Sequence, residues 1–286
     1  MPHRQFVPLT LVALLLLCAA CRSSPTDHRP DYLVAGIESY PLELDPRYAT
    51  DANSVRIGNL IYNSLLRADA NLRLQPELAA SWRRLDQRSY YFRLRDDVRF
   101  HDGQPLTTAD VKFTYESILD PQGRSPKRGL LKHLLAVEQL GRYELRFQLD
   151  APHSPFVENF TMGIVPARAA AGNNPPLGSG PFMLTAIEAG EKVTLTANPN
   201  YWQAKPKLAG VIFKIVPDAM VRILEFKKGA IDFMQNDLEP DMLPWLEKNT
   251  SAEIAIHQGT TYQYIGMNLT HPILRQLKVR QALALA

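Results

Sequence analysis

The sequence predicts a protein of the α/β class with a sizeable core. Short apolar segments with the alternation of β-strands recur along the chain, and segments with helical spacing lie between them. Hydrophobic residues make up 45% and charged residues 21% of the 286 residues, as is ordinary for a soluble globular protein. The formal net charge is only +3 and no Lys/Arg-rich run stands out, so no nucleic-acid partner is expected.

The amino-terminal residues predict an export signal. A weakly basic start is followed by an apolar run at residues 7–17 with four consecutive leucines, which is too short for a membrane span. Two alanines then precede Cys21. We interpret residues 1–20 as a lipoprotein signal peptide, Cys21 as the lipidated residue and residues 21–31 as a linker.

The second cysteine leaves this interpretation with an alternative. Ala-Ala-Cys resembles the lipobox of bacterial lipoproteins, in which the thiol takes a diacylglycerol, but Cys18 stands where that pattern usually has leucine. The residue before Cys18 is a leucine, whereas signal peptidases require a small residue there. The alternative is an ordinary secretion signal in which Cys21 has no role. Cleavage before Cys21 leaves no cysteine in the folded body, so no disulfide is expected.

The first half of the body is expected to mix strands and helices. Residues 32–37 form an apolar run typical of a buried strand. Residues 55–66 have the spacing of an amphipathic helix. Residues 75–82 are interpreted as a short helical turn, and residues 90–95 alternate like a half-buried strand.

A turn, a helix and a hairpin are expected next. Residues 101–105 predict a turn in which Gly103 takes a positive φ. Thr107 is expected to cap a helix, with Asp110 in the reciprocal position, and the helix stops before Pro121. The hairpin follows over residues 137–149.

The remaining segments continue the alternation. A proline- and glycine-rich loop occupies residues 173–181, and Gly229 is expected to close a helix. Expected strands are 182–184, 193–197, 211–216, 231–234 and 262–269, and expected helices are 152–156 (short), 219–228 and 277–286.

Several blocks agree with the pattern of one known family. Residues 75–82 read QPELAASW, residues 98–103 read VRFHDG, residues 105–111 read PLTTADV, residues 178–182 read GSGPF and residues 198–202 read NPNYW. In these blocks the chain resembles the bacterial extracellular solute-binding proteins of family five, which are peptide- and nickel-binding receptors of ABC importers.

The resemblance implies a two-lobed periplasmic-binding-protein architecture of type II. It places the first ligand-binding lobe in residues 32–44 and 178–267, an inserted subdomain in residues 45–177 and the start of the second lobe in residues 268–286. In the family the V-R-x-A motif, here residues 279–282, comes near the middle of the chain. We therefore expect a truncated sequence, either a fragment or a disrupted reading frame, with only the first lobe and its extra subdomain present.

The same resemblance implies two ligand-contacting segments. They are Glu38, Ser39 and Tyr40 after the first strand, and Gly178, Ser179, Gly180 and Phe182 in the glycine loop. The aromatic, polar-tipped side chain of Tyr40 suits a peptide. The alternative is that these are ordinary loop residues, with glycines where the chain passes close to another backbone or to a ligand.

Two other features are interpreted as structural. Trp82 is expected in the core rather than against a ligand. The pair His101 and Asp102 is interpreted as part of a turn rather than as a metal or acid–base site. The seven histidines have no paired ligand spacing, so no metal site and no cofactor are expected.

The implied function is capture of a solute, in the first place an oligopeptide, outside the cytoplasmic membrane. A lipid-anchored periplasmic receptor would close around the solute by a hinge motion and deliver it to ABC permease subunits, without enzymatic activity. The alternatives are a secreted hydrolase, which would require a placed nucleophile and base, a sensor receptor and a non-functional fragment. Alone, the chain is expected to bind peptides poorly or not at all, because one lobe leaves half of the ligand in water.

Overall fold

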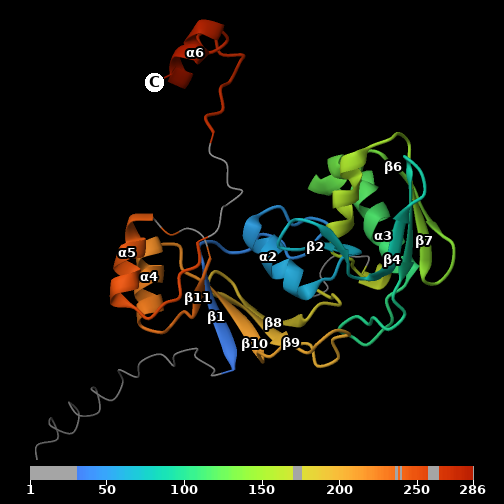
Figure 1. Cartoon of the computed structure of the whole chain (residues 1–286), viewed down its shortest axis with the longest axis horizontal. Coiled ribbons are helices and arrows are strands. Elements are labelled where there is room, and N and C mark those ends of the chain that lie inside the picture. Colours follow the sequence, from blue (N-terminus) through green and yellow to red (C-terminus); the bar gives the residue numbers. More distant parts are fainter. Residues whose placement is uncertain (1–30, 170–175, 236–237, 239, 257–263, 286) are drawn as a thin grey trace, which may run out of the picture. The chain divides into compact units, whose positions relative to one another are not determined.

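The computed structural model describes residues 31–169, 176–235, 238, 240–256 and 264–285 (Figure 1). These residues fall into two compact units, one up to Leu243 and the other from Pro244 onward. None of the helices in this described part has the length and apolarity that a membrane-spanning helix requires. The predicted signal peptide and Cys21 lie outside the described residues.

A five-stranded mixed sheet brings together segments that are distant in the sequence. Its order is β11-β1-β10-β9-β8. The strands are β1 (Tyr32–Ile37), β8 (Phe182–Glu188), β9 (Lys192–Ala197), β10 (Gly210–Ile215) and β11 (Phe233–Met234). β1 runs parallel to both of its neighbours, and β8, β9 and β10 pair antiparallel. The apolar run predicted as a buried strand therefore lies inside the sheet.

Helix α2 (Ala52–Ile61) covers one face of this sheet (Figure 1). The side chain of Asp51 caps it by accepting a hydrogen bond from the Ser54 N–H at 2.9 Å. Ile57 and Ile61, one helical turn apart, are fully buried against residues of β1, β9 and β10. Burial of each contributes about 1.5–3 kcal/mol. Helix α4 (Ala219–Lys227) follows β10 and is closed by Gly229 with φ of 73°, as predicted.

A second, antiparallel sheet has the order β4-β5-β7-β6. Its strands are β4 (Ala79–Arg84), β5 (Ser89–Leu94), β6 (Leu134–Gln139) and β7 (Glu144–Leu149), with the short pair β2 (Leu66–Ala68) and β3 (Leu74–Pro76) beside it. Helix α3 (Thr108–Leu119) and the 3₁₀ segments η1 (Pro121–Gly123), η2 (Pro126–Leu131), η3 (Ser154–Thr161) and η4 (Ala167–Ala169) complete this part. The strand at residues 90–95 and the hairpin are thereby confirmed.

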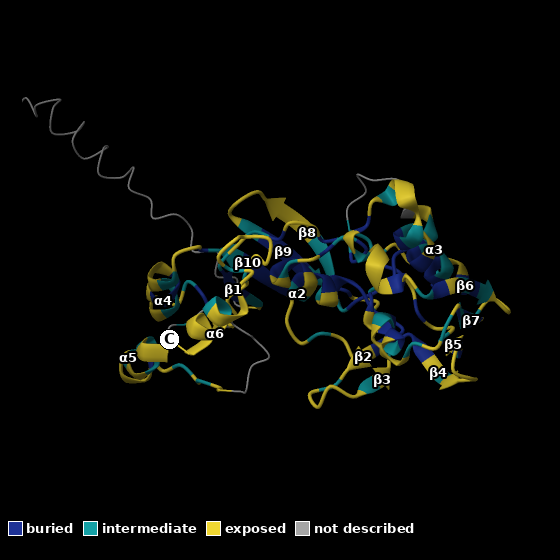
Figure 2. Cartoon of the chain, turned by 90° about the horizontal axis from the view of Figure 1, so that it is seen from above, coloured by how far each residue is buried: buried dark blue, intermediate teal, exposed yellow. Residues whose placement is uncertain are grey.

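Aromatic side chains fill the space between this sheet and its helices, where Figure 2 shows buried residues in dark blue. The rings of Phe92 and Phe160 meet edge to face with centroids 4.6 Å apart, and those of Tyr115 and Phe147 at 4.9 Å. Trp82 is half-buried and stacks on Phe92 at 6.0 Å. It therefore packs against the core from the side of β4, whereas a place within the core was predicted.

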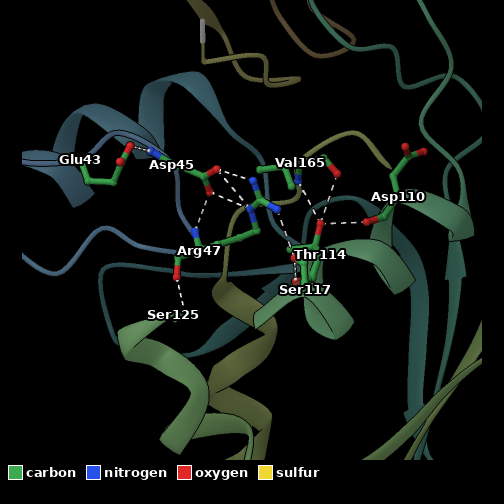
Figure 3. Close-up of polar contacts among 8 residues, drawn as sticks. All are labelled: Glu43, Asp45, Arg47, Asp110, Thr114, Ser117, Ser125 and Val165. Atoms are coloured by element: carbon green, nitrogen blue, oxygen red, sulfur yellow. Dashed lines mark hydrogen bonds and ion pairs between the residues drawn. The ribbon is translucent and has the colours of Figure 1, made fainter. Parts of the chain in front are cut away.

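The start of α3 forms as predicted. The Asp110 carboxylate accepts a hydrogen bond from the Thr107 N–H at 2.8 Å, which is the reciprocal half of a capping box. Asp110 also accepts the Ala167 N–H at 2.9 Å. One turn later, the Thr114 hydroxyl exchanges hydrogen bonds with the backbone of Val165 (Figure 3). These contacts hold residues 165–167 against α3.

Arg47 connects the loop between β1 and α2 to helix α3, which packs on the antiparallel sheet. Its guanidinium binds the carboxylate of Asp45, with Nη2 2.6 Å from Oδ2, and donates to the Ser117 hydroxyl on α3 at 3.2 Å (Figure 3). Its carbonyl accepts the hydroxyl of Ser125 at 2.6 Å. Only 7% of Arg47 is exposed, so its charge is held by a carboxylate and by fixed dipoles rather than by water.

One predicted helical segment is wrong, and another has different bounds. Residues 75–82 form β3 and β4 instead of a helical turn, because Trp82 pairs opposite Phe92 in the sheet. Tertiary pairing outweighs the local helical preference of the two alanines. The helix predicted over residues 55–66 is α2, which starts earlier and ends at Ile61, since Tyr62 is extended with φ −115° and ψ 143°.

Three other predictions need adjustment. The short helix expected at residues 152–156 is η3, which starts at Ser154 and is of the 3₁₀ type. Only Phe233 and Met234 of the strand expected at 231–234 pair in the sheet. Residues 264–269 form no strand, and the beginning of that predicted strand lies outside the described residues.

The carboxy-terminal unit contains α6 (Leu277–Leu285), as predicted, and most of α5 (Leu243–Asn249), which follows η5 (Pro240–Met242). No residue of α6 is buried, and Figure 2 shows it almost entirely in yellow. Leu277, Leu283 and Leu285 are among its exposed apolar side chains.

Candidate ligand-binding face

The end of β1 leads directly into the first predicted ligand segment. β1 is flanked on both sides by parallel strands, so Glu38 stands at the carboxyl edge of three parallel strands. Ligands of open α/β sheets bind outside the carboxyl ends of the strands. Ser39 is exposed, while Glu38 and Tyr40 are half-buried, and Tyr40 packs on the core beneath the sheet.

The first turn of α2 holds this segment in place. The Asn53 amide donates to Oε1 of Glu38 and to the carbonyl of Ser39, both at 3.0 Å. Asp51 accepts the Leu42 N–H at 3.3 Å. Burial opposes ionisation of Asp51, but the hydrogen bonds from Ser54 and Leu42 outweigh it and lower the pKa of this carboxyl. Residues 38–42 are therefore held in place by the buried side-chain amide of Asn53 and by the ionised carboxylate of Asp51.

The second predicted segment has a different environment. Gly178, Ser179 and Gly180 are buried, and Phe182 packs in the core with α2. A Cβ atom at Gly178 would lie 1.9 Å from the Ile61 carbonyl oxygen, and one at Gly180 would lie 2.5 Å from that of Leu60. These glycines are required because the chain crosses the end of α2 at backbone contact. The predicted close passage to another backbone is confirmed.

The structure does not bring the two segments together. The register across β1, β10, β9 and β8 places Met183 in the row of Tyr32. Phe182 therefore lies level with the start of β1, whereas Glu38 follows its end. The six residues of β1 separate these edges by about 20 Å. Helix α2 links them, because Asn53 in its first turn holds one segment and Ile61 at its end contacts the other.

The polar groups of the glycine segment are satisfied by protein. The Gly180 N–H donates to the Ile61 carbonyl at 2.8 Å. The backbone N–H of His101 donates to the Gly178 carbonyl at 2.8 Å, and Nε2 of its ring lies 3.1 Å from the Gly180 carbonyl oxygen. Burial lowers the pKa of His101, although the bond to Gly180 and the charge of Asp102 oppose this effect. His101 thus acts as a neutral structural bridge, in agreement with its interpretation as part of a turn.

Asn63, which the sequence analysis did not single out, joins several of the matching blocks. Its amide donates to Glu77 Oε1 at 2.9 Å, and its Oδ1 accepts from Trp202 Nε1 at 3.1 Å and Ser179 Oγ at 3.3 Å. Asn63 is 2% exposed. Its position just after a helix end carries no recognisable signal in a single sequence, so only the structure identifies it.

One depression of the surface lies away from both predicted ligand segments. A depression of about 360 Å³ on the second sheet is lined by residues that include Ser81, Arg93, Arg95 and Asp97. Arg95 and Asp97 already bind each other at 2.9 Å. Within the part of the chain that the structure describes, no three His, Cys, Asp or Glu side chains gather to hold a metal ion.

Comparison with known proteins defines the class. The structure of NikZ from Campylobacter jejuni, in complex with Ni(L-His), aligns with a TM-score of 0.83 and 29% identity, over 90% of this chain and 53% of that one. The oligopeptide-binding protein AppA from Bacillus subtilis, solved with a nonapeptide, aligns with a TM-score of 0.81 and 31% identity, over 88% and 52%. The fold is that of type II periplasmic binding proteins, and the chain accounts for part of it.

The family follows from the sequence match. Residues 73–286 match the model described as bacterial extracellular solute-binding proteins, family 5 middle. In sequence, AppA is 30% identical over 98% of this chain and 55% of its own length. The chain belongs to family 5 of the bacterial extracellular solute-binding proteins, and it spans about half the length of the relatives it matches.

Proposed function

We propose that the chain contributes to the solute-binding component of an ABC importer, which captures an oligopeptide outside the cytoplasmic membrane and delivers it to the permease. The relatives support a peptide. They include AppA and the di/tripeptide-binding protein 3 of Pseudomonas aeruginosa, which is 30% identical over 99% of this chain and 59% of its own length. The nickel-binding periplasmic protein of Escherichia coli, 26% identical, supports a metal chelate as the second candidate solute.

Glu38, Ser39 and Tyr40 are the proposed solute-facing residues of this chain. The observation that carries this assignment is their place at the carboxyl edge of parallel strands. The second carboxylate oxygen of Glu38 has no partner among the described residues, so it can accept a hydrogen bond from a solute amine or amide. Gly178, Ser179, Gly180 and Phe182 are proposed to act through α2, which they support.

The proposed organisation follows the family. Residues 32–44 and 178–267 would form the first lobe, residues 45–177 an inserted subdomain and residues 268–286 the start of the second lobe. The pairing of β1 with β10 supports the discontinuous lobe. In the whole protein, closure of two lobes would bury the solute. The proposed location is the periplasm or cell envelope, facing outside the cytoplasm, with Cys21 as the lipid anchor to a membrane.

Titration with short peptides, followed by amide signals in NMR, tests this proposal. We expect weak, millimolar binding that shifts the signals of Ser39 and Tyr40 and leaves that of Gly141 unchanged. Glu38→Gln and Tyr40→Ala should each reduce the shifts. Shifts confined to other regions, or none at saturating peptide, would contradict the assignment. Peptide cleavage in the same samples, abolished by a point substitution in the protein, would instead support a hydrolase.

A further inference from the structure

Two histidines that are twenty positions apart in the sequence meet on the surface of the second part of the structure. His133 lies between η2 and β6, and His153 precedes η3. Their ring centroids are 4.6 Å apart. Asp150, at the end of β7, donates its N–H to the His133 carbonyl at 3.1 Å. The hairpin thus fixes the backbone at His133.

Asp150 also determines which tautomer the neutral His133 ring adopts. Its Oδ1 lies 3.0 Å from Nδ1 of His133, so neutral His133 carries its proton on Nδ1 and has a free lone pair on Nε2. Neither Nε2 of His133 nor either ring nitrogen of His153 has a partner among the described residues. A carboxylate that accepts one imidazole N–H and leaves the other nitrogen free is the usual arrangement behind a metal-ligating histidine.

The separation of the rings fits a shared metal ion. A metal–nitrogen bond of about 2.0–2.1 Å places a ring centroid roughly 3.2 Å from the ion. Two such rings at adjacent positions, about 90–109° apart around the ion, have centroids roughly 4.5–5.2 Å apart. The observed 4.6 Å lies within this range, toward the right angle that octahedral and tetragonal ions prefer.

We propose that His133 and His153 bind a hydrated divalent late transition-metal ion through imidazole nitrogens, with Asp150 as the positioning residue. Both rings are half-exposed, so an ion reaches them from solvent. Because the protein supplies two ligands, water completes the coordination and the ion exchanges readily. Imidazole ligands favour copper, nickel and zinc over magnesium and calcium, and Cu²⁺ binds most tightly of the divalent series. This site is independent of the proposed solute-facing residues.

Binding of Cu²⁺ tests the site, measured by titration calorimetry and by electron paramagnetic resonance. Thiols and an amino-terminal histidine bind Cu²⁺ by themselves, so the reference protein is the full chain with Cys18→Ser, Cys21→Ser and His3→Asn. We expect one ion per chain at this site, with hyperfine coupling to two nitrogens. His133→Asn and His153→Asn should each weaken binding by at least about tenfold and remove one nitrogen coupling.

Two further variants separate the roles. Asp150→Asn should weaken binding about tenfold while both nitrogen couplings remain, because it changes the orientation of His133 and not the ligand set. His271→Asn, at an exposed histidine in the other unit, should change nothing. Unfolding midpoints without metal establish that the variants are folded. Equal Cu²⁺ affinity of the reference protein and the folded His133 and His153 variants would overturn the proposal.

Discussion

Nε2 of His101 lies 3.1 Å from the carbonyl oxygen of Gly180, which joins the turn after β5 to the glycine segment that crosses α2. The Gly178 N–H donates to Nδ1 of the same ring at 3.4 Å. The ring must therefore be neutral, with its proton on Nε2, to make both hydrogen bonds. Protonation would place an N–H opposite the Gly178 N–H.

This bridge predicts a loss of stability in acid. Burial lowers the pKa of His101 from 6.5, so just below that pH the unfolded chain binds more protons than the folded chain. The free energy of unfolding should be at full value above pH 6.5 and fall as the pH drops through it. Urea unfolding between about pH 5 and pH 8 measures this dependence.

His101→Gln should flatten that part of the pH profile, because glutamine does not titrate. Asp102, the charged neighbour of His101, is ion-paired with Arg168 at 2.6 Å and stays ionised over this range. Burial opposes its ionisation, but the hydrogen bonds from Arg168 and the Gln104 N–H together with the charge of Arg168 outweigh burial and lower its pKa. His271→Gln, at an exposed position, is the matched control and should retain the wild-type profile. An unchanged slope in His101→Gln would refute the role of the bridge.

Gly178→Ala should be strongly destabilising. Its Cβ would lie 1.9 Å from the Ile61 carbonyl oxygen, and neither backbone can yield without moving α2. We expect a loss of about 3 kcal/mol or more in the free energy of unfolding, measured by chemical denaturation. Gly141→Ala is the control, since nothing lies within 4 Å of its Cβ. Similar stabilities of the two variants would show that the segment repositions freely.

Arg47→Met should cost about 2–4 kcal/mol in the free energy of unfolding. The substitution leaves the carboxylate of Asp45 without its partner and removes the hydrogen bond to Ser117. The control is Arg146→Met, which breaks the exposed pair with Glu138 and should cost about 0–1 kcal/mol. Equal effects in thermal or urea unfolding would contradict the special role of the buried pair.

Acylation at Cys21 stays a prediction from the sequence. Metabolic labelling with a fatty acid should mark the wild-type protein and fail to mark Cys21→Ser, because the thiol is the acceptor. Cys18→Ser should be labelled like the wild type. Label that disappears only in Cys18→Ser would move the site to that residue, and equal labelling of all three proteins would exclude a cysteine anchor.

Local signals were reliable wherever one or two residues decide the backbone. Thr107 and Asp110 form the predicted start of α3, and Gly103 takes φ of 82° in the predicted turn. Both features depend on contacts within a few residues. The alternation in residues 143–149 likewise predicted β7, since a half-buried strand imposes a period of two on its own sequence.

Pairing between distant segments could not be predicted in this way. Residues 75–82 look helical by composition and become strands, because β5 offers Trp82 a partner at Phe92. The same limit applies to the site. The glycines of residues 178–180 indicated a close approach, but only the sheet register places them at the opposite edge from Glu38.

The sequence by itself determined the class of fold, the helix caps, the turn at Gly103 and the membership of a solute-binding family, because short-range chemistry and matching blocks carry these features. The tertiary structure decided which residues share a surface. Asn63 meets Trp202 at 3.1 Å, and His133 meets His153 with ring centroids 4.6 Å apart. Neither pair has a spacing that marks it in the sequence. Such contacts depend on how strands from separate regions pair and pack, which no local segment specifies.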